Sequence, residues 1–144
     1  MLRPMGYPND FMPDVGVEVH DLYGSYMWTK AHVVYILPKP GIEHTVGLAK
    51  EQIKQFQAKV VENDKQYALI CDIRQSDPID KECRNYYLSD KATKNVVSFS
   101  FLVDSQFSMV MANFFIGLTT LKVKVKMFSS APKAVNWSKN QLTP

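Results

Sequence analysis

Four acidic side chains gather around one expected strand–helix junction near the middle of the chain. Asp72 falls at the end of an apolar run, and Asp77, Asp80 and Glu82 follow it closely. Paired carboxylates can act as general acid and base when their surroundings push their pKa values apart. Carboxylates at a helix start also cap free N–H groups and offset the positive end of the helix dipole without any substrate. We therefore favour a capping role, with acid–base catalysis as the alternative.

The two cysteines fall in different local settings. Cys71 lies in the middle of the apolar run and is expected to be a small buried side chain. Cys83 falls in the first turns of the helix that Asp80 would open, where the helix N-terminus, Lys81 and Arg84 would lower the pKa of the thiol. Acidic neighbours oppose that effect, and no histidine is adjacent in sequence to act as a base. A thiol that faces the core is the favoured interpretation.

Motifs for metals, phosphates and cofactors are missing from the sequence. His20, His32 and His44 show neither the spacing nor the nearby cysteine that would indicate converging metal ligands. The sequence contains no C-x-x-C pair and no glycine-rich phosphate loop. We therefore expect no metal, no cofactor and no catalytic residue.

A row of lysines marks a segment near the carboxyl terminus. Lys122, Lys124 and Lys126 alternate with valines, so in a strand they would share one face. Such a row could bind anions, an acidic partner or membrane headgroups. Alternating lysines also keep an exposed strand soluble and discourage edge-to-edge pairing. We favour this second, simpler interpretation.

Length and composition indicate one globular domain. The chain has 144 residues, of which 46% are hydrophobic and 22% charged, as expected for a single folded unit with its own core. Residues 1–13 lack the apolar core of a signal peptide, and polar residues interrupt the most apolar stretch, 96–121. We therefore expect a cytoplasmic protein without stable membrane insertion. The net charge of +3 and the pI of about 8.8 are too mildly basic to indicate a nucleic-acid partner.

Strand-like and helix-like segments alternate along most of the chain. Apolar alternation and β-branched runs predict strands over 15–23, 26–29, 32–37, 67–73, 96–103 and 122–128. Helical spacing and capping residues predict helices over 45–61, from Asp77 or Asp80 to about 88, over 105–118, and after Ser129 or Ser130. This order predicts an α/β domain: a central mixed sheet with an N-terminal β-hairpin and about four helices packed on it. Residues 1–14 are expected to be a flexible extension and 15–144 the domain.

The expected helix over residues 105–118 carries more apolar surface than one packed face needs. Its apolar side chains are Phe107, Met109, Val110, Met111, Phe114, Phe115 and Ile116. The excess has three interpretations: a helix buried on two sides, a dimer interface, or the wall of an apolar ligand pocket. Phe107, Met111, Phe114 and Phe115 are therefore candidate partner-binding or ligand-binding residues.

Three segments of the chain resemble the STAS domain, the fold of bacterial anti-sigma-factor antagonists and of sulphate-transporter tails. The resemblance rests on the strand–turn–helix at 69–86, on 101–105 leading to 112–116, and on 125–130 before the last helix. The resemblance covers about residues 15–140. Within this fold, the chain most resembles small uncharacterised bacterial STAS/SEC14-like proteins. The resemblance implies a non-enzymatic regulatory module that binds a protein partner or a second copy of itself, with Asp72, Asp80 and Lys81 as candidate contact residues. SEC14-like relatives imply the alternative, a carrier or sensor with a small apolar ligand or lipid in a pocket beside residues 105–118.

One residue departs from the pattern of the anti-sigma antagonists. They carry a phosphorylatable serine directly after the aspartate that opens the helix, whereas Lys81 follows Asp80 in this chain. Phosphorylation would add about −1.5 to −2 units of charge at that helix N-terminus, and lysine cannot take part in that chemistry. A switch driven by phosphorylation is therefore disfavoured, and partner binding without phosphorylation is expected.

Overall fold

The computed structural model describes residues 8–62, 64–75, 80–104 and 123–142. Its strands are β1 (His20–Asp21), β2 (Ser25–Lys30), β3 (Val33–Pro38), β4 (Tyr67–Asp72), β5 (Val96–Leu102) and β6 (Lys124–Phe128). Its helices are α1 (Val46–Lys59), α2 (Lys81–Tyr87) and α4 (Ala131–Leu142). The helix expected over 105–118 lies outside the described residues.

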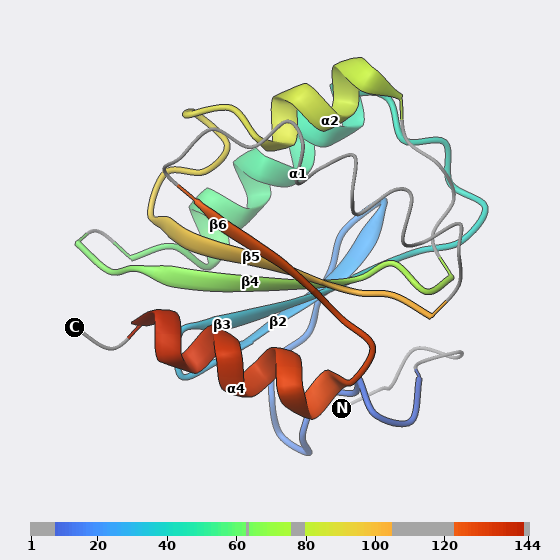
Figure 1. The fold of residues 1–144 in the computed structure, drawn as a ribbon. Coiled ribbons are helices and arrows are strands. Elements are labelled where there is room, and N and C mark those ends of the chain that lie inside the picture. Colours follow the sequence, from blue (N-terminus) through green and yellow to red (C-terminus); the bar gives the residue numbers. More distant parts are fainter. Residues whose placement is uncertain (1–7, 63, 76–79, 105–122, 143–144) are drawn as a thin grey trace.

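The described strands form one mixed sheet in which spatial order follows chain order, from β1 to β6 (Figure 1). β1, β2 and β3 pair antiparallel, and β3, β4, β5 and β6 pair parallel. The expected α/β class, mixed sheet and N-terminal hairpin are confirmed. The first expected strand, 15–23, is much shorter than the alternation suggested, because only His20 and Asp21 pair with β2.

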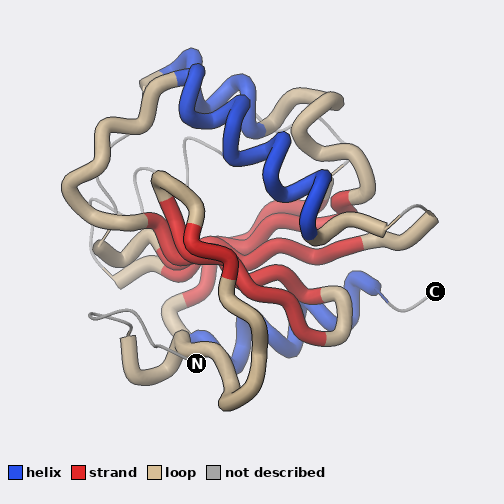
Figure 2. Tube along the Cα trace, turned by 180° about the vertical axis from the view of Figure 1, so that it is seen from behind, coloured by secondary structure: helices blue, strands red, loops and turns tan. Residues whose placement is uncertain are grey.

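Helices cover both faces of the sheet. α1 and α2 lie together on one face, and α4 lies on the other, as Figures 1 and 2 show from opposite sides. Alternate strand residues point to opposite faces, so Val33, Ile70 and Leu102 pack with α4, whereas Val34 and Leu69 pack with α1. Every residue of the central strand β4 is buried, which explains its continuous apolar sequence.

The start of α1 follows its sequence signal. Thr45 is the N-cap, and its hydroxyl oxygen accepts a hydrogen bond from Leu48 N at 3.1 Å. The helix buries Ala49, Gln52 and Phe56 against the sheet. Among the helices that the structure describes, none is long and apolar enough to cross a membrane.

Residues 8–14, part of the expected flexible extension, pack against the α4 face of the sheet. Phe11 is only 2% exposed and belongs to the same core cluster as Trp28, Ile70 and Ala134. The segment covers the hairpin end of this face, and α4 packs chiefly on β4 and β5. The folded unit therefore begins before residue 15.

Candidate functional site

The end of β4 holds a buried carboxylate that is hydrogen-bonded through both of its oxygens. The Asp72 side chain is 1% exposed. Arg74 donates to it three times: from its backbone N to Oδ1 at 3.0 Å, from Nε to Oδ1 at 2.9 Å and from Nη2 to Oδ2 at 2.9 Å. A carboxylate bound to its own guanidinium in this way is a structural anion rather than a free base.

Arg74 also binds a second carboxylate, from the N-terminal segment. Its Nη1 and Nη2 donate to Asp10 Oδ2 at 3.1 Å and to Asp10 Oδ1 at 2.8 Å. These hydrogen bonds hold the pKa of Asp10 below its ordinary value, and the two carboxylates raise the pKa of Arg74. Asp72 thus fixes the guanidinium in place, and the outer edge of the same guanidinium binds a carboxylate that is 44% exposed.

The second candidate carboxylate caps a helix. Asp80 is the N-cap of α2, and its Oδ1 accepts a hydrogen bond from Cys83 N at 2.8 Å. Asp72 shares the α4 face of the sheet with Ile70, whereas Asp80 begins a helix on the opposite face. Asp72 therefore forms an ion pair and Asp80 caps a helix, and the two carboxylates do not form one site. Asp77 lies outside the described residues.

Both thiols are buried, and neither is activated. Cys83 is fully buried, and its Sγ donates to the carbonyl oxygen of Thr45 at 3.9 Å. Burial raises the pKa of Cys83 to about 11, the negative charge of Asp80 adds to the increase, and Arg84 opposes it. Burial also raises the pKa of Cys71. The interpretation of Cys83 as a core-facing thiol is confirmed, and at neutral pH both cysteines are protonated.

A buried chain of polar groups connects β2, α1 and α2. Ser25 Oγ donates to Gln52 Oε1 at 2.7 Å, and Gln52 Nε2 donates to Tyr87 Oη at 2.7 Å. Burial raises the pKa of Tyr87, so its hydroxyl stays protonated. A Cβ atom on Gly24 would lie 3.0 Å from Gln52 Oε1, so a larger residue there would press on the amide. The one sequence signal for this chain is the position of Gln52 on the apolar face of α1, four residues before Phe56, and it was not used in the predictions above.

The first turn of α2 presents polar side chains to solvent. Lys81, Glu82 and Asn85 are exposed, whereas Cys83 faces the core. Farther along the helix, the Tyr86 ring lies 5.8 Å from the Lys50 ammonium of α1. The outer surface of α2 therefore carries charges of both signs on a firmly packed helix.

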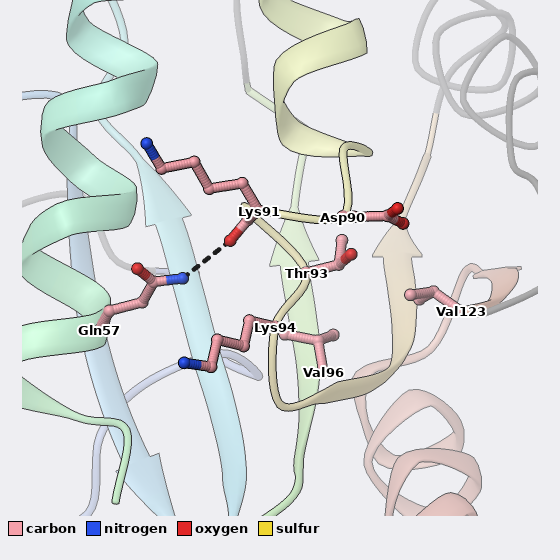
Figure 3. Close-up of a pocket in the computed structure, with 7 residues that line it drawn as sticks. All are labelled: Gln57, Asp90, Lys91, Thr93, Lys94, Val96 and Val123. Atoms are coloured by element: carbon pink, nitrogen blue, oxygen red, sulfur yellow. Dashed lines mark hydrogen bonds between the residues drawn. The ribbon is translucent and has the colours of Figure 1, made fainter. Parts of the chain in front are cut away.

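A hollow of about 480 Å3 lies at the amino-terminal ends of β5 and β6 (Figure 3). Gln57 donates from Nε2 to the carbonyl oxygen of Lys91 at 2.9 Å across one side of the hollow. Figure 3 shows the Lys94 side chain extending toward the Gln57 side, with Asp90 on the other side. The described lining residues are Gln57, Asp90, Lys91, Thr93, Lys94, Val96 and Val123, and more of the surface that they expose to the hollow is apolar than polar. An apolar surface with a few polar groups is typical of small-molecule sites.

The remaining sequence candidates are dispersed or lie outside the described residues. Lys124 and Lys126 are exposed on β6, and the Lys126 ammonium lies 5.5 Å from the Phe128 ring. Phe107, Met111, Phe114 and Phe115 all fall in the segment that the structure does not describe. Within the described ranges, no three His, Cys, Asp or Glu side chains come together as metal ligands would.

The comparisons with known proteins gave a single family. Searches of curated proteins and of solved structures found no match. A sequence model described as a domain of unknown function, DUF7793, matches residues 27–142. This range runs from within β2 to the end of α4 and so includes Asp72, Arg74 and Asp80, together with Gln52 and Tyr87 of the buried chain but not Ser25. The chain therefore belongs to the DUF7793 family.

Proposed function

We propose that this chain is a non-enzymatic, STAS-like regulatory module that binds a partner protein through the exposed first turn of α2. The side chains that could perform chemistry at this junction have structural roles: Asp72 is paired with Arg74, Asp80 caps α2, and Cys83 is buried with a raised pKa. Lys81 and Glu82 of this turn, with Asn85 at the start of the next turn, are the exposed side chains available to a partner. That exposed polar turn is the observation that carries the proposal.

The position of Lys81 favours recognition that does not depend on phosphorylation. In the anti-sigma antagonists that the sequence resembles, the residue at this position is a phosphorylatable serine. Here a cation stands one residue after the cap of a helix that is held by the Asp80 hydrogen bond and by packing on α1. A partner would contact a surface whose charge phosphorylation at this position does not change. Charges at the rim of an interface mainly affect association rate and specificity.

Site-specific photo-crosslinking in cells that express the chain tests this proposal. A photoreactive amino acid is placed at Lys81 or Asn85, and, as matched controls, at the exposed positions Asn136 and Lys139 of α4. We expect a discrete adduct from the α2 positions and none from the controls. An adduct of twice the chain's mass identifies a second copy as the partner. No adduct from α2, or the same adducts from α4, contradicts the proposal.

The alternative function is carriage of an apolar ligand beside residues 105–118, which lie outside the described residues. The hollow shown in Figure 3 is large enough for a small molecule, and its described lining exposes more apolar than polar surface. We prefer the interaction module, because the exposed turn of α2 on which it rests lies within the described residues. Native mass spectrometry of the purified chain would reverse that preference if an apolar molecule were found bound.

A further inference from the structure

A second candidate interface lies on the α4 face of the sheet, under residues 8–14. Trp28 of β2 and Tyr35 of β3 are register partners, and their rings stack with centroids 5.6 Å apart and planes inclined by 3°. Phe11 lies on this pair, with its ring centroid 5.3 Å from that of Trp28 and 5.6 Å from that of Tyr35. We call Trp28 and Tyr35 the aromatic platform, and residues 8–14 the anchor segment.

Arg74 adds a charged contact next to the platform. Because Asp10 and Phe11 are consecutive residues, one dipeptide reaches both the guanidinium and the aromatic rings. Asp72 holds the guanidinium from behind, so the two outer N–H groups keep the geometry that binds a carboxylate in a bidentate way. A fixed guanidinium beside a flat aromatic surface recognises an acidic side chain followed by an aromatic one.

The anchor segment is attached by side chains rather than by strand pairing. Within the described chain, none of residues 8–19 belongs to a strand, and their backbone hydrogen bonds are local ones, such as Phe11 N to the Pro8 oxygen at 3.1 Å. The segment is held by Asp10 on Arg74, by Phe11 on the platform, by the fully buried side chain of Pro13 and by the exposed pair of Asp14 with Lys30. A few anchoring side chains on the face of a sheet are typical of peptide recognition.

We propose that the aromatic platform and Arg74 form a docking surface for a partner's peptide in which an acidic residue directly precedes an aromatic one. Asp10 and Phe11 of the same chain occupy this surface. The family match begins at residue 27, so it includes the platform, Asp72 and Arg74 but not the occupant. The docking surface lies on the α4 face of the sheet, opposite α2, so it goes beyond the function proposed above and is tested independently of it.

Cutting the full chain between the anchor segment and the sheet turns this intramolecular contact into a measurable binding equilibrium. A specific protease site is inserted after Gly16, which lies in an exposed turn with no atom within 4 Å of an added Cβ. The folded chain is then cut, and a labelled peptide with the sequence of residues 8–14 is titrated in by fluorescence anisotropy. A second peptide keeps only the Asp–Phe pair between glycines and serines. Circular dichroism follows the fold throughout.

We expect both peptides to exchange into the cut chain. Phe→Ala in the peptide should weaken binding about 100-fold or more. Asp→Ala in the peptide, or Arg74→Gln in the chain, should weaken binding about 10-fold or more, whereas Lys133→Gln on α4 should leave it unchanged.

Three results would overturn the proposal. The first is a cut chain that unfolds when the fragment leaves, because the segment is then an integral part of the core. The second is failure of the Asp–Phe peptide with glycine and serine flanks to bind. The third is an uncut chain that forms dimers which removal of residues 1–14 abolishes, because the occupant is then a second copy.

Discussion

Arg74 serves two carboxylates whose surroundings differ. Asp72 is almost fully buried, whereas Asp10 is partly exposed. A buried charge that loses its partner keeps its full desolvation cost, but an exposed one returns to water. Both ion pairs are bidentate, through Nε and Nη2 for Asp72 and through Nη1 and Nη2 for Asp10, and we expect unequal effects on stability.

Substitution of Arg74 should show this inequality. Arg74→Met leaves the Asp72 carboxylate buried without its cation, so we expect a loss of about 3–5 kcal/mol in the free energy of unfolding. Asp10→Asn should cost about 1 kcal/mol or less, because Asp10 is partly exposed and solvent screens the pair. Urea denaturation measures both, with Lys133→Met on α4 as the control. Equal effects of the two substitutions would contradict this account.

Asp10 also predicts a pH dependence. Arg74 lowers the pKa of Asp10 in the folded state below its unfolded value of about 3.9. The stability from this pair is therefore fully present above the unfolded pKa and is lost as the pH falls through the folded one. Urea midpoints measured from about pH 6 down to pH 2 should fall less steeply for Asp10→Asn than for the unchanged chain. Parallel profiles would show that the pair contributes nothing.

At the scale of elements, α2 has only seven residues, so its stability depends on hydrogen bonds to the free N–H groups of its first turn. Asp80 accepts the Cys83 N–H at 2.8 Å. Asp80→Ala should cost about 1 kcal/mol of the free energy of unfolding, and Asp80→Asn less, since asparagine is also a good N-cap. Glu82→Gln, an exposed change in the same turn, is the control for charge alone. Chemical denaturation measures all three, and equal losses from Asp80→Ala and Asp80→Asn would argue against capping.

The elements that the sequence predicted correctly are those with local causes. The Thr45 cap and the helical spacing of apolar residues located α1, and the uninterrupted apolar run located β4. The strands on either side of the β2–β3 turn were predicted to within one residue, but the conformation of the turn was not. Ala31 and His32 have φ values of 51° and 65°, a left-handed region that alanine disfavours and that the glycine and asparagine of typical two-residue hairpin turns would have indicated. The pairing of the two strands imposes that conformation.

The candidate site was predicted only in part, because some of its contacts join residues that are far apart in the sequence. Sequence reasoning placed a capping carboxylate at Asp80 and a buried thiol at Cys83, both local properties. It could not find the contact of Arg74 with Asp10, which joins residues 64 positions apart. The buried chain from Ser25 to Tyr87 likewise depends on how α1 and α2 pack.

At the scale of the whole molecule, the folded unit extends beyond the family match. A chain of residues 15–144 loses Phe11 from the core, which should cost about 3–5 kcal/mol and leave most domains folded. A chain of residues 27–142 also loses β1, Leu22 and Ser25, and we expect it to be unfolded. Circular dichroism and thermal melts of the two chains test this order. A cooperative melt of the shorter chain, equal to that of the longer one, would contradict it.

The order of the strands has a consequence for synthesis on the ribosome. Each described strand pairs with the one that precedes it in the chain, so every new strand can join an edge that has already left the exit tunnel. Short sequence separations between paired segments speed folding, and domains begin to fold as they emerge. Of the described elements, α4 emerges last and covers β4 and β5 on the second face of the sheet. Until then that part of the face is open to chaperones.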